Sequence, residues 1–235
     1  MCHAEKGRAV VTISVILNVV IAASSVAAWI SILLGTGDDR SLSHRGIGSL
    51  KYYTVLSNLF SAVVSLGYAK SLLGAAGTPV PAWLLVLRLT AATVVMVTFF
   101  VTILFLTPQY GFKSLYRGGN FWLHLVCPLL ATADTVFLAP VETLPLWSTA
   151  FAMVPTALYA VGYIRMVLAH GAEENGRVYD FYGFLKWGED KIDLVAAVML
   201  LVTWDAWLRT GTSTGNWNQA ATRPLFVRPL WRASE

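Results

Sequence analysis

Two residues of this sequence, Thr54 and His124, have the types and the spacing for nucleophilic chemistry. Thr54 lies about one helical turn inside the apolar stretch 51–73, and His124 lies about one turn inside the apolar stretch 121–138. At about 1.5 Å per residue, both side chains lie roughly 5 Å from the start of their helices. An imidazole can take the proton of a threonine hydroxyl during attack on a carbonyl and return it to a leaving alcohol. The pair therefore indicates acyl transfer on an ester.

A stripe of polar residues continues from Thr54 along the same stretch. Its other members are Ser57, Asn58, Ser61, Ser65 and Tyr68. At about 100° per residue they fall on one face of a helix, which must turn inward because hydrocarbon offers no hydrogen bonds. Asn58 and Ser57 are candidate donors to the oxyanion of a tetrahedral intermediate. Ser and Thr stripes also serve helix packing, which is the alternative interpretation.

Charged residues supply further candidates. Lys51, Lys113 and Arg117 flank the two stretches and are candidates for holding a substrate carboxylate. Asp134 and Asp205 lie inside apolar stretches, where an ionisable group usually has a role. Asp134 lies ten residues after His124, too far along an ideal helix to orient its ring.

Arg88 stands near the start of its own apolar stretch, and we expect its side chain to extend to the lipid headgroups. The alternative is that Asp134 and Asp205 are protonated, or pair with Arg88 or another base. A histidine inside a span is also often only a structural hydrogen-bonding residue, so the chemistry depends on whether Thr54 and His124 meet at a cavity.

The composition indicates an all-α integral membrane protein. Of the 235 residues 56% are hydrophobic and 13% charged, with a mean hydropathy of +0.62, whereas soluble domains are about 25% charged. Apolar stretches of about 18 residues or more are typical of membrane-spanning helices. We predict a bundle of six, at residues 9–34, 51–73, 82–106, 121–138, 147–168 and 191–208. Residues 1–210 form the transmembrane domain, and 211–235 are a basic, Trp-containing tail.

The first stretch resembles a signal peptide, but it is longer than a usual signal core, so we interpret it as a retained span. Six spans place both termini on one side. Basic residues are divided almost evenly between the two sides, and the clustering of acidic residues on the other side favours cytoplasmic termini. Aromatic residues at 179–187 are typical of an interfacial belt.

Several classes of partner are not indicated by the sequence. The formal charge of +4 resides in loops and tails beside the apolar stretches, which fits contact with lipid headgroups rather than nucleic acid. Cys2 and Cys127 show no pairing or metal-ligand spacing. We therefore expect no metal and no cofactor. The oligomeric state is left open.

Three short segments resemble one known family. Lys51-Tyr52-Tyr53-Thr54 resembles the Lys-aromatic-x-Thr start of the second span in the androgen-induced gene / androgen-dependent TFPI-regulating protein family. His124 with Pro128 resembles its second signature, and the segment 182–185 (Tyr-Gly-Phe-Leu) resembles its Tyr-Pro-Phe-Leu stretch, with Gly183 in place of proline. Among bacterial proteins the chain resembles six-span Pr6Pr-type membrane proteins, and a bacterial cell membrane is the expected location.

The resemblance implies an intramembrane threonine hydrolase that cleaves fatty acid esters of hydroxy fatty acids. The family's nucleophile and its histidine partner correspond to Thr54 and His124. Together with their matched depth, this gives a hypothesis of lipid ester hydrolysis, with membrane lipids and a fatty-acyl ester as partners. The alternative is a non-catalytic membrane protein that binds or transports a lipid or small molecule, in which Asp134 and Asp205 matter more.

Overall fold

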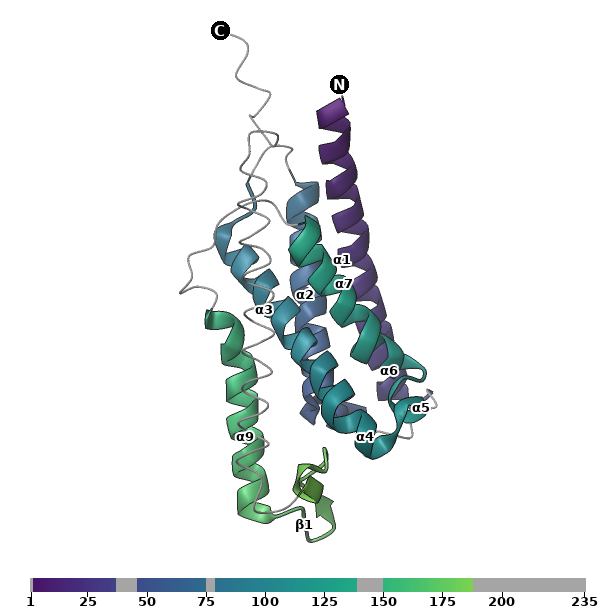
Figure 1. The fold of residues 1–235 in the computed structure, drawn as a ribbon, viewed down its shortest axis with the longest axis vertical. Coiled ribbons are helices and arrows are strands. Elements are labelled where there is room, and N and C mark those ends of the chain that lie inside the picture. Colours follow the sequence, from purple (N-terminus) through teal and green to yellow (C-terminus); the bar gives the residue numbers. More distant parts are fainter. Residues whose placement is uncertain (1, 37–45, 75–78, 139–149, 188–235) are drawn as a thin grey trace.

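The computed structural model describes residues 2–36, 46–74, 79–138 and 150–187 of the chain (Figure 1). Within them are five helices long and apolar enough to cross a membrane, as in an integral multi-pass membrane protein. These spans are Gly7–Leu34, Tyr53–Leu73, Ala82–Tyr110, Gly119–Leu138 and Ala150–His170. The sixth predicted span at 191–208, with Asp205, and the tail at 211–235 lie outside the described residues.

The secondary structure is helical apart from one small hairpin. The α-helices are α1 (Cys2–Leu34), α2 (Tyr53–Leu73), α3 (Ala82–Val101), α4 (Thr107–Tyr110), α5 (Phe112–Leu115), α6 (Gly119–Phe121), α7 (Cys127–Ala133) and α9 (Val154–His170). Three π-helical turns occupy Thr102–Leu106, Trp122–Val126 and Asp134–Leu138. The 3-10 turns are Gly46–Lys51, Ala150–Met153 and Phe184–Trp187. Strands β1 (Glu173–Glu174) and β2 (Arg177–Val178) pair antiparallel.

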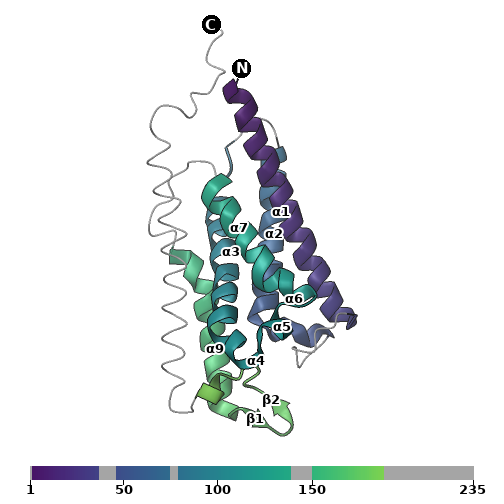
Figure 2. The ribbon, with the colours of Figure 1, turned by 45° about the vertical axis from the view of Figure 1, so that its right-hand side comes forward.

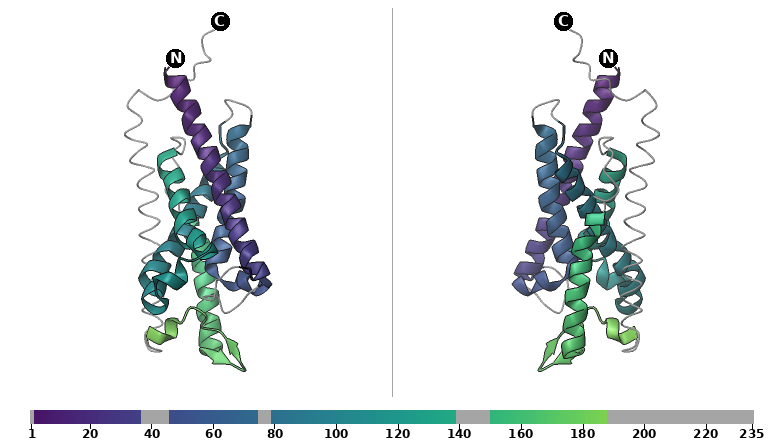
Figure 3. Two further views of the ribbon diagram at one scale, coloured as in Figure 1. Left: turned by 90° about the vertical axis from the view of Figure 1, so that its right-hand side faces the viewer. Right: turned by 90° about the vertical axis from the view of Figure 1, so that its left-hand side faces the viewer.

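Four of the spans form the centre of the bundle. Helix α1 packs on α2, α2 on α3, and α3 on α7, which returns to α1 (Figures 2 and 3). The span that contains α3 is the most enclosed of the five, whereas large apolar side chains such as Val63, Leu66 and Leu158 point outward. An apolar exterior around a partly polar interior is what a lipid environment requires.

The polar stripe of α2 faces inward, as its helical spacing predicted. All six members are buried: Thr54, Ser57, Asn58, Ser61, Ser65 and Tyr68. In Figure 1, α6 and the β1 strand lie towards the end of the bundle where α2 begins. This arrangement places Thr54, at the first turn of α2, under the loops of that end.

Two π-helical turns at this end share one local cause. Pro108 follows the turn Thr102–Leu106 by two residues, and Pro128 follows the turn Trp122–Val126 by two residues. Proline has no N–H to donate to the carbonyl four residues before it. In both cases the N–H just before the proline bonds five residues back, Thr107 to Thr102 and Cys127 to Trp122. Such widened turns are frequent at functional sites, and one of these holds His124.

The segment after β2 closes the same end of the bundle. Asp180, which is buried, accepts hydrogen bonds from the backbone N–H of Phe184 at 2.9 Å and of Leu185 at 2.8 Å. The hydroxyl of Tyr163 in α9 also donates to Asp180. These bonds fix the segment against α9, and Tyr182 and Phe184 join a buried cluster with Tyr52 and Tyr163. The predicted aromatic belt is thus partly an interior cluster.

Candidate active site

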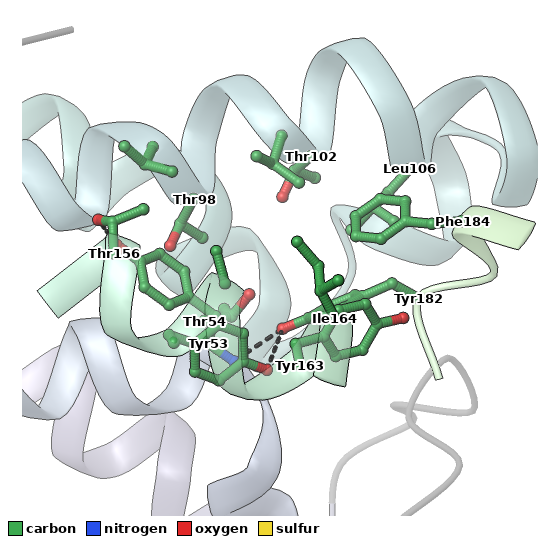
Figure 4. Close-up of a pocket in the computed structure, with 14 residues that line it drawn as sticks. Tyr53, Thr54, Thr98, Thr102, Leu106, Thr156, Tyr163, Ile164, Tyr182 and Phe184 are labelled. Atoms are coloured by element: carbon green, nitrogen blue, oxygen red, sulfur yellow. Dashed lines mark hydrogen bonds between the residues drawn. The ribbon is translucent and has the colours of Figure 1, made fainter. Parts of the chain in front are cut away.

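Two cavities meet at Thr54. The first holds about 690 Å³ of empty space, part of it open, and lies between α3 and α9 (Figure 4). Its walls are mostly apolar, and include Val97, Val101, Leu106 and Ile164. The second holds about 530 Å³, again partly open, and is lined by His124, Asn120 and Tyr52 among others. Thr54 lines both cavities, so its side chain belongs to the wall of each.

Thr54 lies at the start of α2 with its side chain largely enclosed. Its side chain is 9% exposed, and none of the described residues hydrogen-bonds its hydroxyl. It is the second residue of the 21-residue helix α2. The N-terminal turn of a helix carries a partial positive charge, which stabilises the negative charge that develops on an attacking oxygen.

His124 presents one ring nitrogen to a fixed backbone partner. Its Nδ1 lies 2.8 Å from the carbonyl oxygen of Leu115 at the end of α5. A carbonyl only accepts, so Nδ1 carries the proton and Nε2 keeps its lone pair. Tyr116 packs edge-on against the imidazole, and Gly119 allows α6 to approach Ala28 of α1 closely. Neutral His124 therefore has the tautomer of a general base acting through Nε2.

Thr54 and His124 line the second cavity together but are not hydrogen-bonded to each other. Both side chains therefore contribute to the wall of the same cavity. In resting enzymes the catalytic hydrogen bonds are often long and close only around substrate. A substrate or a water molecule in the cavity would have to complete the relay.

Asn58 and Ser57 have structural partners instead of a free donor for an oxyanion. The side-chain nitrogen of Asn58 donates to the carbonyl oxygens of Thr54 at 2.8 Å and Leu123 at 3.1 Å. Ser57 donates to the carbonyl of Thr54 at 3.2 Å and contacts the Thr98 hydroxyl at 2.9 Å. Both N–H groups of Asn58 are used, so it positions the turn that carries Thr54. Neither residue lines a cavity.

Tyr182 also belongs to the site, although the sequence indicated no catalytic role for it and placed it in an aromatic belt and in the Tyr-Gly-Phe-Leu segment. Its hydroxyl oxygen accepts the backbone N–H of Tyr53 at 2.7 Å, beside Thr54 (Figure 4). Like Thr54, it lines both cavities. The signal in the sequence was the Tyr-Gly-Phe-Leu segment, but nothing local indicates that the loop folds back onto α2.

The three predicted carboxylate-binding residues do not line either cavity. Lys113 and Arg117 are exposed on the connection between the third and fourth spans. The Lys51 ammonium lies 4.4 Å from the ring centroid of Phe181, which does line the second cavity. Partial burial lowers the pKa of Lys51. Of the three, Lys51 is the one beside a cavity.

Asp134 is engaged away from the cavities, and the expectation for Arg88 is wrong. Arg88 does not extend to the headgroups but is buried, and its guanidinium pairs with Asp134 at 2.5 Å. Ser14 and Asn18 of α1 also donate to that carboxylate, at 2.7 and 2.6 Å. The guanidinium lies 3.9 Å from the centroid of Tyr68. The Asp134 carboxylate and the Arg88 guanidinium are buried as a pair, because burying either charge alone in this interior would be costly.

No group of His, Cys, Asp and Glu side chains that could hold a metal ion occurs in the part of the chain that the structure describes. Comparisons with family models, curated proteins and solved structures find no match to this chain. The site consists of a hydroxyl at a helix start, an imidazole with a free lone pair, and two cavities that share Thr54 in their walls, which together suit cleavage of an ester with an apolar arm.

Proposed function

We propose that this protein is an intramembrane hydrolase of lipid esters, with Thr54 as nucleophile and His124 as general base and then general acid. The observation that carries the proposal is that the two side chains line one cavity, with Nδ1 of His124 tied to a carbonyl and Nε2 left as the base. The resemblance to the androgen-induced gene / androgen-dependent TFPI-regulating protein family points to the same pair.

The reaction has two steps. The Thr54 oxygen bonds to the ester carbonyl carbon while its proton passes to Nε2 of His124, and the tetrahedral intermediate then expels the alcohol oxygen, which takes that proton. A water molecule next attacks the acyl-threonine ester, again giving a proton to His124. The Thr54 oxygen leaves with that proton, and the products are a carboxylic acid and an alcohol. The helix start favours the charge on the threonine oxygen in both steps.

We assign one arm of the substrate to each of the two cavities. His124 lines the second cavity and must reach the leaving oxygen, so the alcohol arm lies there. The acyl arm then extends into the first cavity, whose walls are mostly apolar. An ester with two apolar arms, such as a fatty acid ester of a hydroxy fatty acid, has this shape. Lys51 is the candidate for holding a free carboxylate at the rim.

The test is turnover by the purified protein in detergent. The substrates are nitrophenyl esters of fatty acids and a palmitoyl ester of a hydroxystearic acid. We expect Thr54→Ala and His124→Ala each to lower kcat about 10³-fold or more, and a fluorophosphonate probe to label Thr54. The matched controls are Thr90→Ala, which removes a hydroxyl bonded to Val86 outside the cavities, and His170→Ala on the exposed surface. Activity and labelling that survive both site variants would refute the proposal.

One observation favours a second function, a non-catalytic lipid binder. Thr54 and His124 are not hydrogen-bonded to each other, and the walls of the first cavity are mostly apolar. A binder takes up a fatty acid or lipid ester stoichiometrically and releases it unchanged. Equilibrium binding of a radiolabelled ester, followed by recovery of the intact molecule after long incubation, distinguishes this function from hydrolysis.

The proposal includes the parts of the chain beyond the described residues. We infer a sixth span at 191–208, both termini on the cytoplasmic side, and a bacterial cell membrane as the location. Cysteine accessibility at the two ends of the chain, in sealed vesicles of known orientation, tests the topology.

A further inference from the structure

The junction of the two cavities contains two hydroxyl groups, and the hydrolase proposal uses one of them. The residues that line both cavities are Thr54, Leu106 and Tyr182. Leu106 is apolar, so an ester carbonyl at this junction meets the hydroxyls of Thr54 and Tyr182. Thr54 attacks, which leaves the carbonyl oxygen in need of a donor as it becomes negative.

We propose that the phenol of Tyr182 is a further catalytic residue, which donates the hydrogen bond that stabilises the oxyanion formed on attack by Thr54. This inference rests on the proposed hydrolase function and deepens it. It replaces Asn58 and Ser57 in that role, since the donors of Asn58 are both taken by backbone carbonyls and neither side chain lines a cavity.

The hydrogen bonds of Tyr182 leave its proton available. Its oxygen accepts the N–H of Tyr53 at 2.7 Å. The neighbouring Tyr159 hydroxyl lies 3.4 Å away and donates its own proton to the carbonyl of Lys51 at 2.7 Å. Among the described residues no shorter hydrogen bond donated by the Tyr182 hydroxyl is found. Accepting the Tyr53 N–H polarises the phenol and makes it a stronger donor.

The phenol is also held rigidly at the junction. The bonds that Asp180 accepts from Tyr163, Phe184 and Leu185 fix the segment on both sides of Tyr182. The ring of Tyr182 packs against those of Tyr52, Tyr163 and Phe184, with centroids 5.4 to 6.0 Å apart. A donor that is fixed before reaction needs no reorganisation when the charge develops.

Burial is the main cause that raises the pKa of the Tyr182 phenol well above its ordinary value, and Tyr159 adds to it. The phenol therefore stays protonated over the whole neutral range, as a donor must. Because it transfers no proton in the reaction, Tyr182 contributes only a hydrogen bond.

The test compares Tyr182→Phe with Tyr179→Phe in the full-length protein. Loss of one oxyanion donor costs about 10²–10³-fold in kcat, and we expect this loss for Tyr182→Phe with KM changed less than about threefold. Tyr179→Phe makes the same change three residues earlier, where the ring stacks on His170 outside the cavities, and should keep full activity. A Tyr182→Phe enzyme with wild-type kcat would overturn the inference.

A second measurement separates catalysis from packing, because Tyr182→Phe also removes the acceptor for Tyr53. Replacing Tyr182 by fluorinated tyrosines keeps the hydroxyl and strengthens it as a donor. We expect kcat to rise with phenol acidity at position 182 and not at 179. No dependence at 182 would overturn the inference even if Tyr182→Phe were inactive. Full activity of Thr54→Ala would instead refute the hydrolase function, so the two failures are distinguishable.

Discussion

Asn58 joins the turn that carries Thr54 to the turn that carries His124. Its side-chain nitrogen lies 2.8 Å from the carbonyl oxygen of Thr54 and 3.1 Å from that of Leu123, the residue before His124. The residue is 1% exposed, so both bonds are shielded from competing solvent. One amide group thus sets the relative depth of the proposed nucleophile and base.

Removal of this link should lower activity through geometry. We expect Asn58→Ala to reduce kcat about 10- to 100-fold, because a displacement of about 1 Å can cost that much. Two buried carbonyls also lose a hydrogen-bond donor, so the free energy of unfolding should fall by about 1–3 kcal/mol. Steady-state kinetics and thermal unfolding measure the two effects. Ser61→Ala, one turn further along the stripe and outside the cavities, is the control, and an equal loss of kcat there would contradict the positioning role.

The first cavity should set the length of the acyl arm. Ala160 of α9 lines it, whereas Leu158 on the same helix is 70% exposed to the surroundings. We expect Ala160→Trp to fill the cavity and to lower kcat/KM for long acyl chains at least about tenfold, because steric overlap in a packed site is costly. Short acyl esters should retain wild-type rates. Leu158→Trp should leave kcat/KM unchanged for both long and short acyl esters. An equal loss of kcat/KM at all chain lengths in Ala160→Trp would contradict the placement of the acyl arm in the first cavity.

The Arg88–Asp134 pair should act on stability and not on chemistry. Both side chains are at least nine-tenths buried, and neither lines a cavity. Asp134→Leu leaves the guanidinium without its anion and should destabilise the protein by about 3–5 kcal/mol. Arg88→Met combined with Asp134→Leu should recover most of that loss. The double variant also tests the transport alternative. If it folds but no longer transports or binds its ligand, the Arg88–Asp134 pair has a functional role besides its structural one.

Alkaline pH should destabilise the fold partly through Tyr182. Its pKa is raised on folding from an ordinary value of 10.0, mainly by burial. A raised folded pKa means that the contribution to stability is complete below the unfolded pKa and is lost as pH rises towards the folded pKa. We expect the unfolding temperature to fall between about pH 9 and about pH 11, and to fall less in Tyr182→Phe. If the unfolding temperature fell equally with pH in the wild type and in Tyr182→Phe, the phenol would not be buried as described.

Much of the architecture follows from local pattern. Length and hydropathy predict the five described spans to within a few residues, since an apolar run of that length has few other stable environments. Helical spacing also predicts that the stripe beginning at Thr54 faces inward. The depth of His124 follows from simple counting, because rise per residue is nearly constant in a helix.

The partners of the polar residues do not follow from that pattern. Arg88 was expected at the headgroups and instead reaches Asp134, forty-six residues away. Pro128 signals a local irregularity, but the widened turn that presents His124 emerges only in the folded chain. The partner of Arg88 and the shape of the turn at His124 both depend on which helices pack beside them.

The sequence by itself determined that this is a multi-pass helical membrane protein with an inward polar stripe, and it predicted Thr54 and His124 as a pair. Only the tertiary structure decided that Asn58 links two helices, that Asp134 is neutralised by Arg88, and that Tyr182 returns to the start of α2. Periodicity is a property of one helix, whereas a hydrogen bond in a nonpolar interior forms with whichever donor packing brings near.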